Sequence, residues 1–156
     1  GKKVIIVGMD IRKPTLAQYI GISPKYGVTQ YLSSQSLSIS QIVEKVPGVD
    51  NLDTIVAGPV PPNPAELLAS EKVDELFAEL RDMYDYIIVD TAPLGLVSDT
   101  FTLDRIADAT ICVCRLNRTK TTAFKELNDI YEHNRLKKLS IIINGSQSRK
   151  EYGYGN

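Results

Sequence analysis

The sequence predicts a layered α/β fold with a mainly parallel sheet and flanking helices. Short runs of apolar, mostly β-branched residues alternate with segments whose apolar residues recur at helical spacing, which is typical of such folds. The runs are apolar throughout rather than alternating, so we expect strands that are covered on both faces. The predicted strands are Val4–Val7, Leu52–Val56, Tyr86–Val89, Thr110–Arg115 and Leu139–Asn144.

The clearest helix start lies at Asn63-Pro64-Ala-Glu66. We expect Asn63 as the N-cap, Pro64 as the first helical residue and Glu66 as the second member of a capping box. A second helix starts at Ser70, and its apolar residues form one stripe. These stripe residues are Val73, Leu76, Phe77 and Leu80.

A further helix is expected from about Thr119 to Asn134. Its buried side is predicted to consist of Phe124, Leu127, Ile130 and Tyr131. Shorter helical patterns occur nearer the start of the chain. They cover Thr15–Ile20, Val28–Leu32 and Ile39–Val46.

Length and composition indicate one ordinary globular domain. The chain has 156 residues, 43% hydrophobic content and a formal net charge of −1, so nothing suggests the basic face of a nucleic-acid binder. No apolar run approaches the roughly 18–20 residues that a membrane span requires. Cys112 and Cys114 lie on one face of a predicted strand, which indicates core residues in a reducing compartment. We expect a domain over residues 1–148 and a flexible tyrosine-containing tail over 149–156.

Two of the predicted strands end in an aspartate. Asp90 follows Tyr86–Val89, and Asp10 with Arg12 follows Val4–Val7. Because the carboxyl ends of parallel strands share one edge, the two carboxylates could converge there, as a magnesium–nucleotide site requires. The residues alone leave simpler roles open: Asp90 could cap a turn, and Asp10 with Arg12 could form a surface ion pair.

Three segments together resemble the cytoplasmic kinase domain of bacterial tyrosine kinases, which are tied to capsule and exopolysaccharide export. Val7–Pro14 resembles the Walker A′ motif of that family, and Tyr86–Pro93 resembles its Walker B motif. Ala57–Leu68 contains the Pro-Pro-Asn-Pro-x-Glu-Leu-Leu sequence that distinguishes this family from partitioning ATPases. The resemblance implies a P-loop NTPase-like fold and covers nearly the whole chain.

The resemblance also implies roles for single residues, with ATP and Mg²⁺ as cofactors. Asp90 would bind Mg²⁺, Asp10 would help to hold the metal near the γ-phosphate, and Arg12 would face phosphate or the incoming tyrosine. Asn144 resembles the asparagine that contacts adenine, although a residue at a strand end can also serve only a turn. The phosphoacceptors would be Tyr152 and Tyr154, unless the tail is merely aromatic.

The sequence departs from the family pattern in two ways. Gly8 stands where the family has the first aspartate of Walker A′, a candidate base for the acceptor hydroxyl. The chain also contains no Gly-x-x-x-x-Gly-Lys-Ser/Thr phosphate loop, which would supply the lysine and hydroxyl around the phosphates. We therefore expect the first strand and the phosphate loop to lie upstream, and this chain by itself to be inactive.

The resemblance implies an autokinase that phosphorylates its C-terminal tyrosines in trans and regulates polysaccharide polymerisation and export. It would be the cytoplasmic domain of an inner-membrane protein. Its partners would be sister subunits in a ring-like homo-oligomer, a membrane activator segment and a protein-tyrosine phosphatase, with no nucleic acid. Two alternatives remain: a partitioning-type ATPase switch, and a catalytically degenerate scaffold of polysaccharide assembly, which Gly8 favours.

Overall fold

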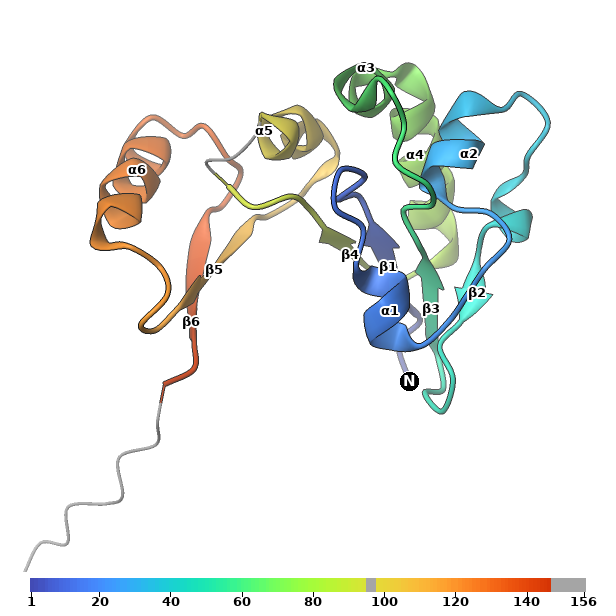
Figure 1. The fold of residues 1–156 in the computed structure, drawn as a ribbon, viewed down its shortest axis with the longest axis horizontal. Helices are drawn as coiled ribbons and strands as arrows, with labels where there is room; N and C mark the ends of the chain where they lie inside the picture. Colours follow the sequence, from blue (N-terminus) through green and yellow to red (C-terminus); the bar gives the residue numbers. More distant parts are fainter. Residues whose placement is uncertain (95–97, 147–156) are drawn as a thin grey trace, which may run out of the picture. The chain divides into compact units, whose positions relative to one another are not determined.

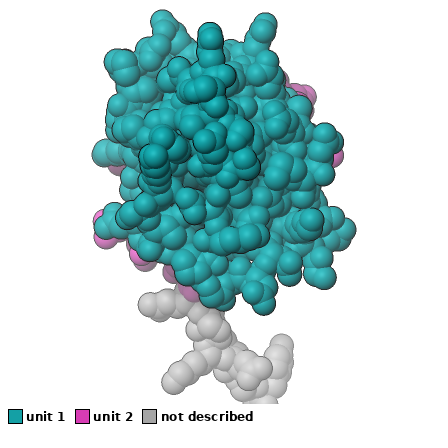
Figure 2. Space-filling view, turned by 90° about the vertical axis from the view of Figure 1, so that its right-hand side faces the viewer, with its two compact units in different colours: residues 1–106 teal, residues 107–156 magenta. Residues whose placement is uncertain are grey.

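The computed structural model describes residues 1–94 and 98–146 of the protein (Figure 1). The chain divides into two compact units, residues 1–106 and residues 107–156 (Figure 2). No helix within the described residues is both long and apolar enough to cross a membrane.

The first unit is built on a four-stranded sheet in the order β2-β3-β1-β4. β1 (Val4–Gly8) lies between β3 (Leu52–Ile55) and β4 (Tyr86–Asp90) and is parallel to both. The short strand β2 (Glu44–Lys45) is antiparallel to β3. Because Val4 is in register with the first residue of each neighbour, the three parallel strands end at nearly the same level.

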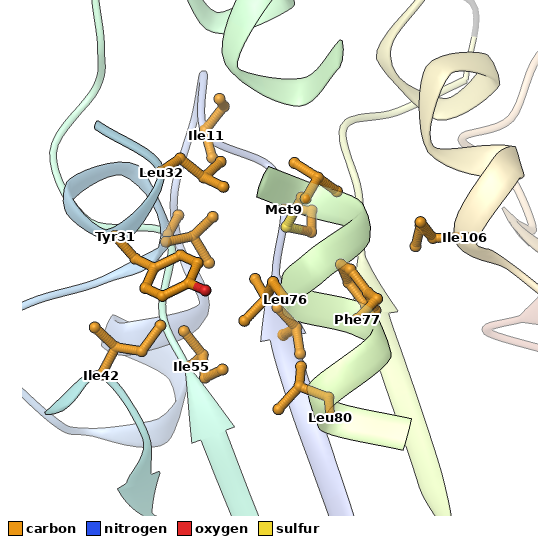
Figure 3. Packing of buried hydrophobic residues seen from close by; sticks show 14 of the residues in the cluster. Met9, Ile11, Tyr31, Leu32, Ile42, Ile55, Leu76, Phe77, Leu80 and Ile106 are labelled. Carbon is orange, nitrogen blue, oxygen red and sulfur yellow. The ribbon is translucent and has the colours of Figure 1, made fainter. Parts of the chain in front are cut away.

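The first unit has a single apolar core, to which its sheet and most of its helices contribute side chains (Figure 3). The predicted stripe of α4 is confirmed, since all four of its residues are buried. Side chains from β1 and the loop after it, including Ile5, Val7 and Met9, belong to the same cluster. The helices of this unit are α1 (Leu16–Ile20), α2 (Val28–Ser33), α3 (Pro64–Ala69), α4 (Glu71–Met83) and α5 (Asp99–Leu103).

The second unit is a parallel pair of strands joined by one helix. β5 (Ile111–Arg115) pairs in register with β6 (Ser140–Asn144), and α6 (Thr121–Glu132) connects them. The buried residues in the described part of this unit are Cys114, Leu127, Ile130 and Leu136. Cys112 is half-buried, and both cysteines are free thiols.

The mixed α/β class and the mainly parallel sheet are confirmed, and all five predicted strands form with bounds that differ by one residue. The prediction of a helix over Ile39–Val46 is wrong. A three-residue 3₁₀ turn covers Ile39–Gln41, after which the chain extends into β2. There the pairing of Glu44 and Lys45 with β3 satisfies backbone groups that a helix would have satisfied internally.

Two other expectations about helices are corrected. On α6, Phe124 and Tyr131 are 40% and 65% exposed, because only Leu127 and Ile130 point to the narrow surface that a two-stranded sheet offers. At α3 no capping box forms. Asn63 Nδ2 instead donates to Glu66 Oε2 at 2.7 Å, so the two side chains bond to each other rather than to the backbone.

The expectation that every strand is covered on both faces is also wrong. β1 and most of β3 are buried, but β4, β5 and β6 expose large apolar side chains. β4 is the edge of its sheet, and β5 and β6 have only each other as neighbours among the described residues. The exposed residues are Tyr86, Ile88, Ile111, Val113, Ile141, Ile142 and Ile143.

Candidate functional site

The structure brings Asp10 and Asp90 together at the carboxyl edge of the first sheet. Gly8, the last residue of β1, is in register with Asp90, the last residue of β4. The carbonyl oxygen of Asp90 then accepts hydrogen bonds from the backbone N–H groups of Met9 and Asp10, at 2.7 and 3.0 Å. These two bonds tie the loop after β1 to the last residue of β4.

The Asp10 side chain shapes its own loop. Its Oδ1 accepts hydrogen bonds from the backbone N–H groups of Arg12 at 3.2 Å and Lys13 at 3.0 Å, an arrangement that stabilises turns after aspartate. Within residues 1–94 and 98–146, no hydrogen-bond donor contacts Oδ2 of Asp10 or either carboxylate oxygen of Asp90. These oxygens are available as ligands.

The electrostatics of the pair fit a divalent cation. Partial burial raises the pKa of Asp90, and the negative charge of Asp10 raises it further, although the residue keeps an exposed face. A cation bound between the two carboxylates would relieve this repulsion. No group of three or more His, Cys, Asp or Glu side chains in the described part of the chain could hold a metal. A cation here would therefore complete its shell with water or phosphate oxygens, as Mg²⁺ does.

Arg12 forms an ion pair with a residue that the sequence did not single out. Arg12 Nε lies 2.7 Å from Oδ2 of Asp99, and Nη2 lies 3.0 Å from Oδ1. Asp99 is buried in the first turn of α5. The hydrogen bonds to Asp99 raise the pKa of the Arg12 guanidinium, with a smaller contribution from the charge of Asp10. The only signal in the sequence was Ser98-Asp99, a polar pair typical of helix starts, which indicates nothing about burial.

The surroundings of Gly8 leave little room for a side chain. A Cβ at this position would lie 3.1 Å from the backbone nitrogen of Ala57 and 3.2 Å from Cδ2 of Leu16. The first contact is with backbone that continues β3, and the second is with the first residue of α1. The fold is thus packed around glycine at the position where the family pattern has an aspartate.

The proline-rich segment between β3 and α3, residues 56–63, is held by hydrogen bonds from the start of α2. Val28 N–H donates to the Val56 carbonyl at 2.8 Å, and Thr29 Oγ1 donates to the Pro59 carbonyl at 2.9 Å. Gly58 has a φ of +85°, a conformation that favours glycine. A pocket of about 320 Å³ lies beside this segment and is lined on its other side by Pro14, Leu16 and Ala17. Neither aspartate lines it, so it is separate from the carboxylate pair.

The other predicted site residues, Asn144, Tyr152 and Tyr154, belong to residues 107–156. Asn144 is the last residue of β6 in the second unit, where its side chain is exposed and its carbonyl accepts a hydrogen bond from Leu116 N–H at 2.9 Å. Its contact with adenine stays a prediction. Tyr152 and Tyr154 lie outside the described residues.

Comparisons with known proteins give consistent matches, although no family model matches the chain. Tyrosine-protein kinase YwqD of Bacillus subtilis is 35% identical over 156 residues, which are 99% of this chain and 65% of that protein. Tyrosine-protein kinase CpsD of Streptococcus agalactiae is 30% identical over 159 residues, which cover the whole chain and 69% of that protein. The chain thus spans about two thirds of the length of these relatives.

Comparison with solved structures gives matches of the same kind. The VpsO kinase domain superimposes with a TM-score of 0.82 at 34% identity, over 94% of this chain and 71% of that one. The septum site-determining protein MinD of Pyrococcus horikoshii, at 17% identity and a TM-score of 0.68, shares the fold. From these similarities over nearly its full length, the chain belongs to the bacterial tyrosine-protein kinase family.

Proposed function

We propose that this chain supplies the metal-binding and γ-phosphate-binding part of an ATP-dependent tyrosine autokinase. The observation that carries the proposal is the junction of Asp10 and Asp90 at one sheet edge, with Arg12 two residues away. The two carboxylates proposed to bind the metal and the Arg12 guanidinium proposed to bind phosphate thus lie in the two Walker-type segments of a kinase family. The fold neighbour MinD was solved with Mg-ADP, which supports a nucleotide as ligand.

The roles follow from the chemistry of the side chains. Asp90 would bind Mg²⁺ directly or through a water, and Asp10 would use its free Oδ2 for the same ion. Bound Mg²⁺ would neutralise charge on the phosphates during transfer. Arg12 would stabilise the charge of the γ-phosphoryl group, because a guanidinium matches phosphate oxygens with paired hydrogen bonds. Asn144 would contact the adenine.

The reaction would be transfer of the γ-phosphoryl group to a tyrosine. A bond forms between the tyrosine Oη and the γ-phosphorus, the bond from that phosphorus to the bridging oxygen breaks, and ADP leaves. The phenolic proton is lost to solvent, since Gly8 cannot accept it. A loose transition state needs little help from a base, so this loss is compatible with transfer.

The wider assignment rests on the family. The acceptors would be Tyr152 and Tyr154 of a neighbouring subunit, reached in trans within a ring-like homo-oligomer at the cytoplasmic side of the inner membrane. A membrane activator segment and a protein-tyrosine phosphatase would set the phosphorylation level, and that level would regulate capsule or exopolysaccharide export. The 156 residues alone would be inactive, because they contain no Gly-x-x-x-x-Gly-Lys-Ser/Thr phosphate loop.

One observation favours a second candidate, a degenerate scaffold that regulates polysaccharide assembly by contacts alone. A Cβ at Gly8 would lie 3.1 Å from the Ala57 nitrogen and 3.2 Å from Leu16 Cδ2, so an aspartate there would require these neighbours to shift. In that case full-length protein carrying Asp90→Asn would support polysaccharide production as well as the unmodified protein does.

The kinase is tested by incubating the full-length protein with Mg²⁺-ATP and measuring phosphotyrosine and released phosphate in parallel. Phosphotyrosine that forms in step with ATP consumption supports the kinase. Phosphate release without phosphotyrosine would indicate an ATPase switch instead. The absence of both products would favour the scaffold.

A further inference from the structure

Asp99 is the buried partner of Arg12. Both carboxylate oxygens of Asp99 accept hydrogen bonds from one edge of the guanidinium, formed by Nε and Nη2. The Asp99 side chain is 3% exposed, whereas that of Arg12 is 36% exposed. The carboxylate therefore forms a fixed anchor beneath a guanidinium that reaches the surface.

The pairing leaves the other edge of the guanidinium available. Arginine carries five N–H donors in a rigid plane, and the pair with Asp99 uses one on Nε and one on Nη2. Both hydrogens of Nη1 and the second hydrogen of Nη2 remain. Because the plane is rigid, a bond along one edge fixes the direction of the other edge, which matches the spacing of phosphate oxygens.

Helix α5 is held at both of its ends. Near its start, Thr100 Oγ1 donates to the Ala92 carbonyl at 3.2 Å, which joins the helix to the turn after β4. Just beyond its end, Arg105 donates to both carboxylate oxygens of Asp74 on α4 and to the carbonyl of Leu68 on α3. Asp99 therefore lies on a helix that is hydrogen-bonded to the segment after Asp90 and is connected through Arg105 to α3 and α4.

The burial of Asp99 requires its partner. A carboxylate taken out of water is costly unless it is paired and hydrogen-bonded. Arg12 is its one hydrogen-bonding and charged partner in residues 1–94 and 98–146. The dependence is mutual, since Arg12 is otherwise a long side chain on a turn with many rotamers.

We propose that Asp99 is the positioning residue of Arg12: it binds one edge of the guanidinium so that the opposite edge is pre-oriented for the transferred phosphoryl group. The inference rests on the proposed function. Pre-orientation of this kind acts on the transition state more than on nucleotide binding, because misplacement of a charge-stabilising group mainly slows the chemical step.

The test uses the full-length protein with Asp99→Asn, Arg12→Lys and both changes together. Asp99→Asn should lower kcat for tyrosine phosphorylation about 10- to 100-fold while KM for ATP changes less than about threefold. Arg12→Lys should cause a loss of similar size, and the double variant should be no slower than the slower single variant, since both changes remove one unit. Asp85→Asn, which removes a lysine-paired carboxylate just before β4 in the same unit, should leave kcat unchanged.

A second measurement is independent of turnover. In the unmodified protein the Arg12 Nε–H should give a distinct, exchange-protected NMR signal, and Asp99→Asn should abolish that protection. Fully additive losses in the double variant, a higher kcat in Asp99→Asn, or a signal that Asp99→Asn leaves unchanged would each overturn the inference. Unmodified protein that binds nucleotide but forms no phosphotyrosine contradicts the proposed function instead, and the NMR signal then decides the Arg12–Asp99 pair by itself.

Discussion

The backbone N–H of Asp10 donates a hydrogen bond to the carbonyl oxygen of Asp90 at 3.0 Å. These residues are 80 positions apart in the chain, yet this bond joins their backbones at one sheet edge, close enough for the charge of Asp10 to raise the pKa of Asp90. The contact continues the β1–β4 pairing by two residues beyond Gly8. The geometry of the proposed metal site is therefore set by backbone pairing, which substitution of either side chain should leave intact.

Replacement of either carboxylate should weaken metal-dependent nucleotide binding without unfolding the protein. In the full-length protein we expect Asp10→Asn and Asp90→Asn each to lower the affinity for Mg²⁺-ATP about tenfold or more, because a divalent ion loses a charged ligand. Titration calorimetry at fixed nucleotide concentration and varied Mg²⁺ measures this. Asp85→Asn is the matched control, since Asp85 precedes the same strand at its opposite end and pairs with Lys2. Equal affinities in all four proteins would rule out these ligands.

The packing around Gly8 predicts that a methyl group there is destabilising. Gly8→Ala should lower the free energy of unfolding by about 1–3 kcal/mol, the usual cost of overpacking, because the Ala57 backbone cannot retreat without disturbing the loop after β3. Leu16→Ala in the same protein should recover part of the loss by removing the second close contact. Denaturant unfolding of the parent and the two variants measures both effects. A Gly8→Ala protein as stable as the parent would contradict the packing seen here.

The hydrogen bond between Tyr84 and Asp53 predicts a loss of stability at high pH. Tyr84 Oη donates to Asp53 Oδ2 at 2.7 Å, and burial followed by this hydrogen bond raises the pKa of Tyr84. Above the ordinary phenol pKa of about 10, the unfolded chain releases this proton and the folded chain keeps it, so stability falls as pH rises. Below pH 10 the contribution is fully present.

Tyr84→Phe tests that prediction. At neutral pH it should cost about 1–3 kcal/mol, because Asp53 is buried and loses a donor. Between roughly pH 10 and 12 the variant should show a shallower fall in stability than the parent. Tyr86→Phe, at a neighbouring exposed tyrosine, should leave the free energy of unfolding unchanged. Parallel pH profiles for Tyr84→Phe and the parent would exclude the Tyr84 pKa as the cause.

Arg105 connects three helices, and its removal should lower the stability of the protein rather than its affinity for nucleotide. Its guanidinium contacts Asp74, the Thr102 carbonyl and the Leu68 carbonyl. Arg105→Ala should lower the free energy of unfolding by about 1–2 kcal/mol, a modest value because the pair with Asp74 is partly exposed. Thermal unfolding checks this, and a change above about 4 kcal/mol would contradict a partly solvated role.

Sequence patterns predicted the parts of the fold that depend on local chemistry. The β-branched runs identified β1, β3 and β4, and the spacing of Val73, Leu76 and Leu80 identified the buried face of α4. The positions of Asp10, two residues after β1, and of Asp90, at the end of β4, indicated that the two converge, because parallel strands end at one edge. Each of these signals is carried by neighbouring residues in the chain.

The remaining features depend on long-range packing. β2 pairs with a strand eight residues later and replaced the expected helix. Phe124 and Tyr131 follow the helical period but lie beyond the width of the two-stranded sheet. Asp99 reads as a polar helix start, and only its contact with Arg12, 87 positions away, shows why it is buried. No local pattern reports how an element is covered.

The central claim is tested most directly by peptide-level mass spectrometry of the full-length protein after incubation with Mg²⁺-ATP, with Asp90→Asn treated in parallel. The account predicts phosphate on Tyr152 or Tyr154 in the unmodified protein and its loss in Asp90→Asn. Unphosphorylated tyrosines in a protein shown to bind nucleotide, or equal phosphorylation in both proteins, would contradict a kinase site built on Asp10 and Asp90.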